Sequence, residues 1–532
     1  MTSGTTAPGL RRAGAGMAAG TVLSRITGLV RTGALAAALG VTSLADAYNV
    51  ANTVPTILLV LVTGGTLSAV LVPLLVESDD LDDRRARAES LGALVIAVTG
   101  VATLLAVVGS PLLARLFALG LEGADRDEFV STATLLLVLF APQVLAYGVS
   151  VHAVAVLNAA GRLALGSFAS VATNVVTVAG IVAYVLVRDD TDSGGTRALV
   201  VLGAATTAGV VVMAGIQVWG ARRVLPGLRL RPRLRRDATT RRVLRLGRWT
   251  LLYVIANQVG LAVVLTVATS SPGGASAYQW GFALMQLPYA IIAVSILSAV
   301  YPQVSRAARH DPERYAALVS GGMRALLVLL LPAAVLLAVL AEPLTRVLLG
   351  YGAVDEPGVR LIATAVSLFA LALLPFTAFQ LLTRACFARG DTRAPALVNV
   401  AVNVVNVLGA LLALRSAGTG SLAVLVVAYA ASYVAGCLLL GAHLRQRRPG
   451  VLAGTADLAV RLLGPVVGMV AIALLVEGFV EGERTGGAVE AAGTVLIVSL
   501  ASGTTYLLLL RWCAPTVVAA VRGRVRRTRH RS

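Results

Sequence analysis

The chain has 532 residues, of which 57% are hydrophobic and only 13% are charged, whereas a soluble domain carries about a quarter charged residues. This composition leaves too little polar surface for a soluble protein of this size. The net charge of +19 would suit a nucleic-acid ligand, but no aromatic platform accompanies the Arg-rich segments, so we expect no nucleic-acid partner. Three cysteines without a CxxC pair and four scattered histidines argue against a disulfide framework and a zinc site.

Apolar stretches long enough to cross a bilayer, which takes about 20 residues each, recur along the whole chain. The first contains Arg25 and Arg31 and has no credible cleavage site, so we predict a spanning helix rather than a signal peptide. The pattern therefore predicts an all-α integral membrane protein with about fourteen spans. The predicted spans are residues 13–40, 47–76, 90–118, 129–157, 163–187, 197–219, 246–270, 277–303, 316–348, 358–387, 394–415, 420–442, 457–477 and 487–511.

The loops between these spans alternate in charge. Basic loops include residues 222–248 and the C-terminal tail after Arg522, whereas the intervening loops, such as residues 122–128 and 477–490, are acidic or neutral. Because Arg-rich loops stay on the cytoplasmic side, we predict a multi-pass protein of the bacterial plasma membrane with both termini in the cytoplasm. The basic loops then face anionic lipids of the inner leaflet.

The chain also repeats itself. Residues 45–48 and 67–70 resemble residues 275–278 and 297–300 at a constant offset of 230 positions, and residues 174–180 resemble residues 403–409 at an offset of 229. Six spans per repeat preserve orientation, which predicts two pseudo-symmetric six-helix lobes around a central cavity. The expected organisation is an N-terminal lobe (1–220), an Arg-rich cytoplasmic linker (221–245), a C-terminal lobe (246–443), and two additional helices with a basic tail (444–532).

Two arginines in the first predicted span are the strongest candidates for a substrate site, because charge inside a membrane is costly. Arg25 and Arg31 are six residues apart, so they differ by about 120° around a helix and can both border a wide cavity. They could bind an anionic group such as a pyrophosphate. Alternatively, Arg31 extends to the outer interface. Asp46, at the start of the second span, could pair with one of them or be stabilised by the helix dipole.

Amide side chains form a second set of candidates. In the eleventh span, Asn399, Asn403 and Asn406 follow each other at helical spacing and make one polar stripe. Amides of this kind could line the substrate path or coordinate Na⁺, or they could simply form interhelical hydrogen bonds. The other candidates are Asn49, Asn52, Asn257, Gln258 and Gln286.

The sequence shows no catalytic constellation: it lacks a Walker A motif, GxSxG and HExxH. We therefore expect a transporter rather than an enzyme, without a cofactor. Its energy would come from the membrane potential or from a Na⁺ or H⁺ gradient.

Several motifs resemble the MurJ/MviN family of lipid II flippases, in the multidrug/oligosaccharidyl-lipid/polysaccharide superfamily. They are residues 24–31 (SRITGLVR), residues 45–48 with Pro55, and residues 388–395, which contain Arg389, Gly390, Asp391 and Arg393. The resemblance implies a flippase that carries lipid II, a polyprenyl-pyrophosphate glycolipid, between leaflets by alternating access. It also implies that Arg25 and Arg31 hold the pyrophosphate and that Asp46 is a family acid. Partners would be membrane lipids and proteins of cell-wall synthesis or division.

The sequence departs from the family pattern where further cationic residues are expected. Leu59 and Val60 take the place of an Arg pair, and Ala283 takes the place of another Arg. The predicted cavity is therefore less cationic than the family pattern. Three alternatives stay open: a flippase for another lipid-linked glycan, an ion-coupled multidrug exporter, and a cell-wall scaffold that does not transport.

Overall fold

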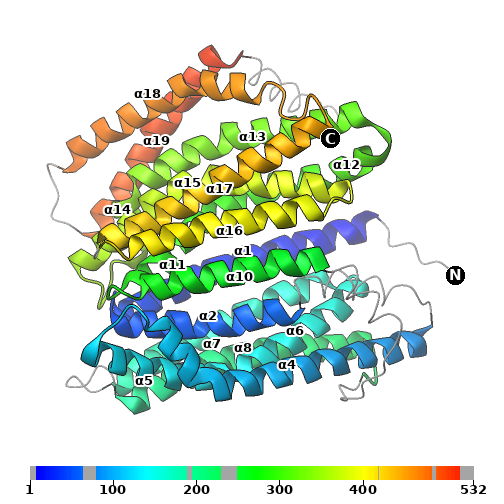
Figure 1. Cartoon of the computed structure of the whole chain (residues 1–532), viewed down its shortest axis with the longest axis vertical. Coiled ribbons are helices and arrows are strands. Elements are labelled where there is room, and N and C mark those ends of the chain that lie inside the picture. Colours follow the sequence, from blue (N-terminus) through cyan, green and yellow to red (C-terminus); the bar gives the residue numbers. More distant parts are fainter. Residues whose placement is uncertain are drawn as a thin grey trace. The chain divides into compact units, whose positions relative to one another are not determined.

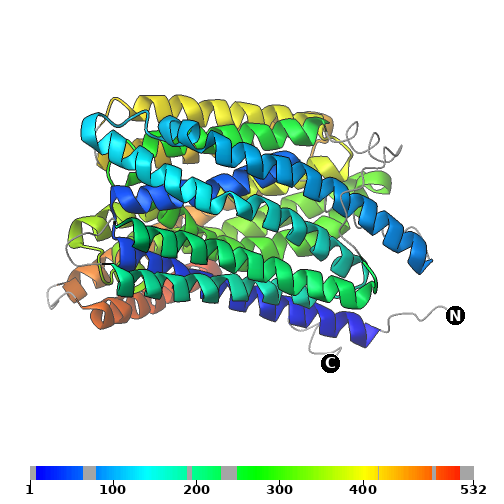
Figure 2. The same cartoon turned by 90° about the horizontal axis from the view of Figure 1, so that it is seen from below.

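The computed structural model describes residues 7–63, 80–188, 195–228, 248–416, 419–481 and 487–515, which form helices and the turns between them (Figures 1 and 2). Fourteen helical stretches in this part of the chain are long and apolar enough to cross a membrane. The predicted all-α membrane fold is thereby confirmed. Helices suit this environment because they satisfy their backbone N–H and C=O groups internally.

In the described residues the first six spans contain seven helices, because the fourth span is divided. Pro142 lacks a backbone N–H and begins a new helix directly after Ala141. The third span begins nine residues earlier than predicted, where the Asp80 side chain accepts a hydrogen bond from the N–H of Asp82. The helices are α1 (Ala7–Leu39), α2 (Ser43–Thr63), α4 (Leu81–Phe117), α5 (Gly123–Phe140), α6 (Pro142–Ala159), α7 (Leu163–Val187) and α8 (Thr196–Val224).

The next six spans are interrupted at two places. After Pro288 the chain makes one turn of π-helix, η1 (Tyr289–Ala293), as is common where proline disturbs helical hydrogen bonding. The predicted span 316–348 is two helices that meet at Leu340. The helices are α10 (Arg248–Ala268), α11 (Gly274–Pro288), α12 (Val294–His310), α13 (Pro312–Val339), α14 (Ala341–Leu349), α15 (Glu356–Ala388), α16 (Arg393–Ala413) and α17 (Thr419–Arg447).

The last two spans, α18 (Thr455–Glu481) and α19 (Ala488–Cys513), pack against each other. α18 also packs on α13, and α19 packs on α14. The hydroxyl of Tyr506 donates a hydrogen bond to the carbonyl of Val328, 2.8 Å away. These contacts attach the two additional helices to the third span of the second repeat.

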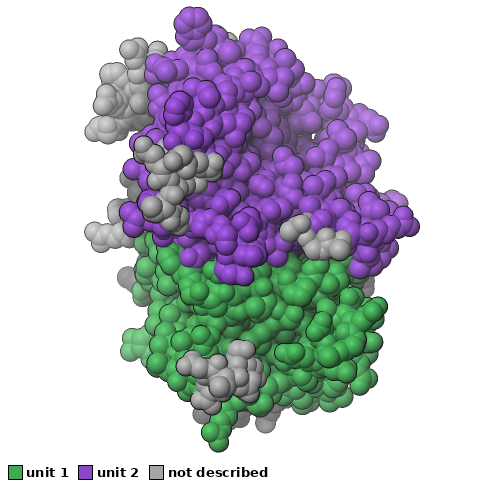
Figure 3. All heavy atoms as spheres, turned by 90° about the vertical axis from the view of Figure 1, so that its left-hand side faces the viewer, with its two compact units in different colours: residues 1–276, 351–354 green, residues 277–350, 355–532 purple. Residues whose placement is uncertain are grey.

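The chain divides by internal contacts into two units, coloured separately in Figure 3. Unit 1 comprises residues 1–276 and 351–354, and unit 2 comprises residues 277–350 and 355–532. The boundary between these units lies within α11, and most of the predicted linker 221–245 is outside the described residues. The division of the chain into lobes 1–220 and 246–443 stays a prediction.

Packing within each unit reproduces the sequence repeat. A Cβ atom at Gly180 would lie 2.1 Å from the Cβ of Ala205, and one at Gly409 would lie 2.1 Å from the Cβ of Ala428. Both glycines therefore let a fifth span of the repeat approach the sixth very closely.

Tyrosine contacts repeat as well. Tyr48 meets Phe140 edge-on in unit 1, with ring centroids 5.4 Å apart. Its counterpart Tyr278 meets Phe369 in the same way in unit 2, at 5.0 Å. In unit 2 this pair extends into a larger aromatic cluster, which joins α11, η1, α15 and α17. The other members of this cluster are Phe282, Tyr289, Phe376, Phe379, Tyr429 and Tyr433.

Candidate functional site

The two candidate arginines lie on a helix that is fixed by its small residues. A Cβ atom at Gly20 would lie 2.9 Å from the Cβ of Ser167, so α1 and α7 pack closely there. Arg25 is exposed and Arg31 is half-buried. Neither forms an ion pair with an acid in the described ranges, so both positive charges are available to an anionic ligand.

Asn174 of α7 holds the segment of α1 that carries Arg25. Its side-chain amide donates to the carbonyl of Ser24 at 3.1 Å and to the hydroxyl of Thr27 at 2.9 Å. Thr27 also donates to carbonyls of the preceding turn of α1. Asn174 is buried, so its hydrogen bonds fix the rotation of α1 about its axis and the direction in which Arg25 leaves the helix.

Asp46 lies in the first turn of α2 and contacts the first turn of α11. Only 1% of its surface is exposed. Its Oδ1 accepts a hydrogen bond from the backbone N–H of Ser276 at 2.7 Å, and the neighbouring Asn49 amide donates to the Ser276 hydroxyl at 2.9 Å. The positive end of the α11 dipole and a free backbone N–H thus stabilise the carboxylate. In this structure Asp46 makes no ion pair with Arg25 or Arg31 of the described α1.

The other amide candidates are scattered along their helices. Asn52 lies half-buried on α2, and Gln258 and Gln286 lie half-buried on α10 and α11. Asn257 donates to the carbonyl of Tyr253 in its own helix at 3.1 Å. A role for these side chains in binding substrate stays a prediction.

The polar stripe of α16 faces mainly inward. Asn399 and Asn406 are buried, whereas Asn403 is half-buried and donates to the carbonyl of Asn399 at 2.9 Å. This hydrogen bond within one helix uses an amide N–H of Asn403. Coordination of Na⁺ by the stripe stays a prediction.

The Arg389–Arg393 motif forms a turn between α15 and α16. Gly390 adopts the left-handed conformation, with φ at +75°. Asp391 then accepts a hydrogen bond from the N–H of Ala394 at 3.1 Å, which caps α16. Its other oxygen lies 2.9 Å from His443 Nε2 and 3.9 Å from Arg447, both on the last turns of α17.

The electrostatics of Asp391 follow from these neighbours. Burial opposes its ionisation, but the N–H of Ala394, the hydrogen bond from His443 and the charges of His443 and Arg447 outweigh burial. Together they lower the pKa of Asp391 below its ordinary value. The motif thus joins the ends of α15, α16 and α17.

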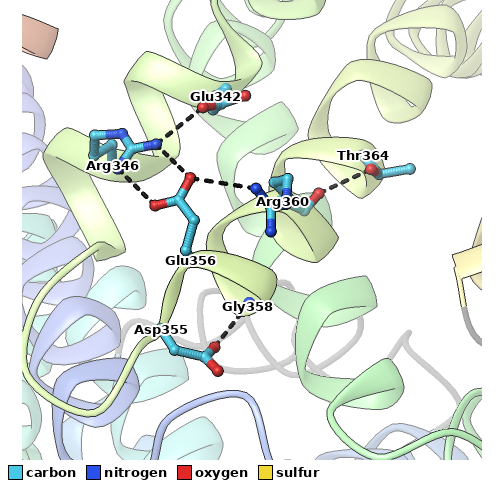
Figure 4. A network of polar contacts seen from close by, with 7 residues as sticks. All are labelled: Glu342, Arg346, Asp355, Glu356, Gly358, Arg360 and Thr364. Atoms are coloured by element: carbon cyan, nitrogen blue, oxygen red, sulfur yellow. Dashed lines mark hydrogen bonds and ion pairs between the residues drawn. The ribbon is translucent and has the colours of Figure 1, made fainter. Parts of the chain in front are cut away.

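A second ionic network surrounds the loop between α14 and α15 (Figure 4). The Arg346 guanidinium donates two hydrogen bonds to Glu356, at 2.7 and 2.8 Å, and one to Glu342 at 3.0 Å. The hydrogen bonds to Glu356 are the largest cause of the raised pKa of Arg346. Asp355 caps α15 through the N–H of Gly358. This network connects the two ends of the loop.

Sequence reasoning missed Ser276, His443 and Arg346. Ser276 carried a signal: it lies 230 positions after Asp46, which is the repeat offset, so it occupies the place of Asp46 in the second repeat. His443 had none, because its partner Asp391 lies between two other helices. Arg346 had a partial signal, since Glu342 lies four residues before it in the same helix, whereas Glu356 lies across a loop.

Fourteen spans, an internal repeat and two arginines in the first span that pair with no acid among the described residues define a multispanning membrane transporter. The fold agrees: the chain resembles a solved structure described as lipid II flippase MurJ in an inward closed conformation, with a TM-score of 0.75 and 18% identity, over 94% of this chain and 99% of that one. It also resembles an inward-facing multidrug transporter of the MATE family, with a TM-score of 0.65 and 13% identity, over 80% of this chain and 95% of that one.

The family follows from the sequence comparisons. The model of the family described as lipid II flippase MurJ matches residues 35–489, and the chain belongs to that family. A relative named lipid II flippase MurJ, from Burkholderia cenocepacia, is 28% identical over 396 residues, which are 73% of this chain and 75% of the relative. Arg25 and Arg31 lie just before the segment that the family model matches.

Proposed function

We propose that this protein is a flippase that moves lipid II from the inner to the outer leaflet of the bacterial plasma membrane. Membership of the MurJ family over residues 35–489 carries the proposal. The alternatives are a flippase for another lipid-linked glycan, a multidrug exporter and a scaffold, and family membership favours none of them.

The arginines of α1 supply the chemistry that a pyrophosphate requires. Arg25 is exposed, Arg31 is half-buried, and neither is neutralised by an acid in the described chain. A guanidinium presents its N–H donors in a planar fork that matches phosphate oxygens. Arg25 and Arg31 would therefore bind the pyrophosphate, while Asn174 keeps the segment that carries them in place. Leu59, Val60 and Ala283 leave this site less cationic than the family pattern.

Both termini face the cytoplasm in this proposal. Two exposed tryptophans, Trp219 near the end of α8 and Trp512 at the end of α19, lie next to Arg-rich segments. The Arg223 guanidinium lies 3.8 Å from the ring centroid of Trp219. Tryptophan and arginine together favour the membrane interface on the side of anionic lipids, which supports this orientation.

The driving force would be the membrane potential or a Na⁺ or H⁺ gradient, because the sequence carries no ATP-binding motif. A pyrophosphate is anionic, so its crossing responds to the membrane potential. The released lipid II must be consumed by enzymes that polymerise it, which makes cell-wall synthesis or division proteins the expected partners.

Complementation in bacteria depleted of their own lipid II flippase tests the function, with lipid II assayed in the outer leaflet. The wild type should rescue growth and restore delivery, whereas Arg25→Ala and Arg31→Ala should abolish both. Arg461→Ala is a matched control, because Arg461 is an exposed partner of Asp457 on α18. Failure of a correctly inserted wild type would refute lipid II as the cargo. Growth rescue by Arg25→Ala without delivery would instead indicate a scaffold.

A further inference from the structure

The last turn of α1 accepts hydrogen bonds from residues of both sequence repeats. The final four carbonyls of a helix have no partner within the helix, yet all four of α1 accept a hydrogen bond. Three donors come from the first repeat and one comes from the loop between α14 and α15, in the second. The donors, in order for the carbonyls of residues 36 to 39, are Gly40 N at 2.8 Å, Ala353 N at 2.8 Å, Arg188 Nη1 at 3.1 Å and Thr42 Oγ1 at 3.0 Å.

The end of α4, the third span of the first repeat, also contacts the second repeat. The carbonyl of Phe117, the last residue of α4, accepts a hydrogen bond of 2.5 Å from the hydroxyl of Thr269. Thr269 directly follows α10, the first span of the second repeat. In the loop after α4, a Cβ atom at Gly120 would lie 2.6 Å from the Cβ of Ser270.

These two contacts are related by the repeat. α1 and α10 are the first spans of the two repeats, and α4 and α13–α14 are the third spans. In each contact the end of a first span meets the end of the third span from the other repeat. We call residues 37–40 with 352–353 the first clasp, and residues 117–120 with 269–270 the second clasp. Both clasps lie entirely within unit 1.

Glycine makes these contacts possible. A Cβ atom at Gly352 would lie 2.4 Å from the carbonyl oxygen of Ala37, and one at Gly40 would lie 2.7 Å from the carbonyl oxygen of Ala353. Both glycines also have positive φ, +63° and +66°. In each case a larger residue would force the two backbones apart.

We propose that the two reciprocal clasps form the latch that holds the outer end of the transporter closed, and that both open when the cargo is released. The proposal rests on the proposed function and its orientation, which places the ends of α1, α4 and α10 at the outer face. The clasp contacts join neutral groups, and neutral hydrogen bonds exchange for hydrogen bonds to water at a small net cost. Gly352 and Ala353 are already exposed, so water can replace these contacts readily.

A disulfide tests the first clasp. Ala37→Cys and Ala353→Cys, combined in a chain without its three native cysteines, place two thiols where the backbones are 2.8 Å apart. Oxidation should abolish lipid II delivery, and reduction should restore it. Each single variant under the same oxidant is the control. Continued delivery by a chain shown to be cross-linked would overturn the latch.

Glycine variants test both clasps without a cross-link. Ser276→Cys provides a reporter, since Ser276 is fully buried in this structure, and a membrane-impermeant maleimide reaches it only after the outer end opens. Gly120→Ala and Gly352→Ala should raise its labelling rate at least about fivefold, the lower range of conformational coupling.

Two further glycines are matched controls. Gly109, on α4, has no atom within 4 Å of its Cβ position, and neither does Gly161, whose φ is +73°. Gly109→Ala and Gly161→Ala should leave labelling unchanged. Equal labelling of clasp and control variants would overturn the latch while leaving the flippase intact. Failure of the wild type to deliver lipid II would refute the function, and the labelling would still decide the latch.

Discussion

Asp46 and Asp391 perform the same hydrogen-bonding task at two places in the molecule. Each accepts a hydrogen bond from a backbone N–H in the first turn of a helix, Asp46 from Ser276 at 2.7 Å and Asp391 from Ala394 at 3.1 Å. They differ in how far along the sequence the donor lies: Ser276 is 230 residues from Asp46, and Ala394 is three residues from Asp391. They also differ in surroundings: Asp46 is buried without a cationic partner in the described chain, whereas Asp391 pairs with His443.

Because of this difference, the two aspartates should affect different properties of the protein, namely folding stability and conformational change. Asp391 lies only three residues before the N–H that it caps, so it moves with α16. It therefore stabilises that helix in every state of the protein. A contact between α2 and α11 persists only while those helices stay together. Asp391 should therefore act mainly on folding, and Asp46 should act on the equilibrium between transport states.

Replacing Asp46 should have the largest effect on transport. Asp46→Ala leaves the buried N–H of Ser276 without an acceptor, which costs about 1–3 kcal/mol, and removes this contact between α2 and α11. We expect outer-leaflet lipid II to fall to the level of depleted cells, while Asp46→Asn, which keeps an oxygen acceptor, retains part of the delivery. Normal delivery by Asp46→Ala would remove the contrast with Asp391.

Replacing Asp391 should act on stability instead. Asp391→Ala loses a helix cap, worth about 1 kcal/mol, together with the contact to His443. We expect a lower thermal unfolding temperature in detergent, and delivery reduced only in proportion to the folded protein. Asp311→Ala is the control, because Asp311 caps α13 through Arg314 N at 2.9 Å from an exposed position. A transport defect in Asp391→Ala at normal stability would contradict this assignment.

The pH dependence of stability should distinguish Asp391 from an uncharged cap. Its pKa is lowered from an ordinary value of 3.8, so the charged form stabilises the fold. This contribution is fully present above pH 3.8 and is lost as pH falls through the lower folded-state pKa. Unfolding measured against pH should show a difference in unfolding free energy between the wild type and Asp391→Asn that shrinks as pH falls below 3.8. A difference that persists unchanged in acid would assign it to another group.

The Arg346 network should show the smallest effect. Arg346→Gln breaks hydrogen bonds to Glu342 and Glu356, whose side chains are each 45% exposed. Exposed ion pairs contribute about 0–1 kcal/mol and weaken with salt. The loss of unfolding free energy should be of this size and should diminish at high ionic strength. A loss larger than that of Asp391→Ala would show that the loop between α14 and α15 depends on these charges.

The spans could be predicted from the sequence because length and apolarity decide them. Their internal breaks could not be placed as well. Pro142 divides the fourth span, and Leu340 separates α13 from α14, although both lie within single predicted runs. Hydropathy averaged over a run does not register one interrupted hydrogen bond, so these boundaries need the local backbone geometry.

The candidate site was predictable only in part. Charge within a span identified Arg25, Arg31 and Asp46, but not their partners. Asn174 and Ser276 contact them from 150 and 230 residues away, and no local pattern encodes such contacts. The cap formed by Asp391 is local, yet its bond to His443 depends on where α17 ends.

The aromatic cluster of unit 2 has a consequence for optical spectroscopy. In unit 2 the rings of α11, η1, α15 and α17 form one continuous cluster, whereas Tyr48 and Phe140 form a single edge-on pair in unit 1. Near-ultraviolet circular dichroism depends on fixed aromatic packing. The aromatic cluster of unit 2 therefore contributes to this signal, and the ellipticity of the helices reports on the whole chain. Comparing the two signals during denaturation would show whether the units unfold together.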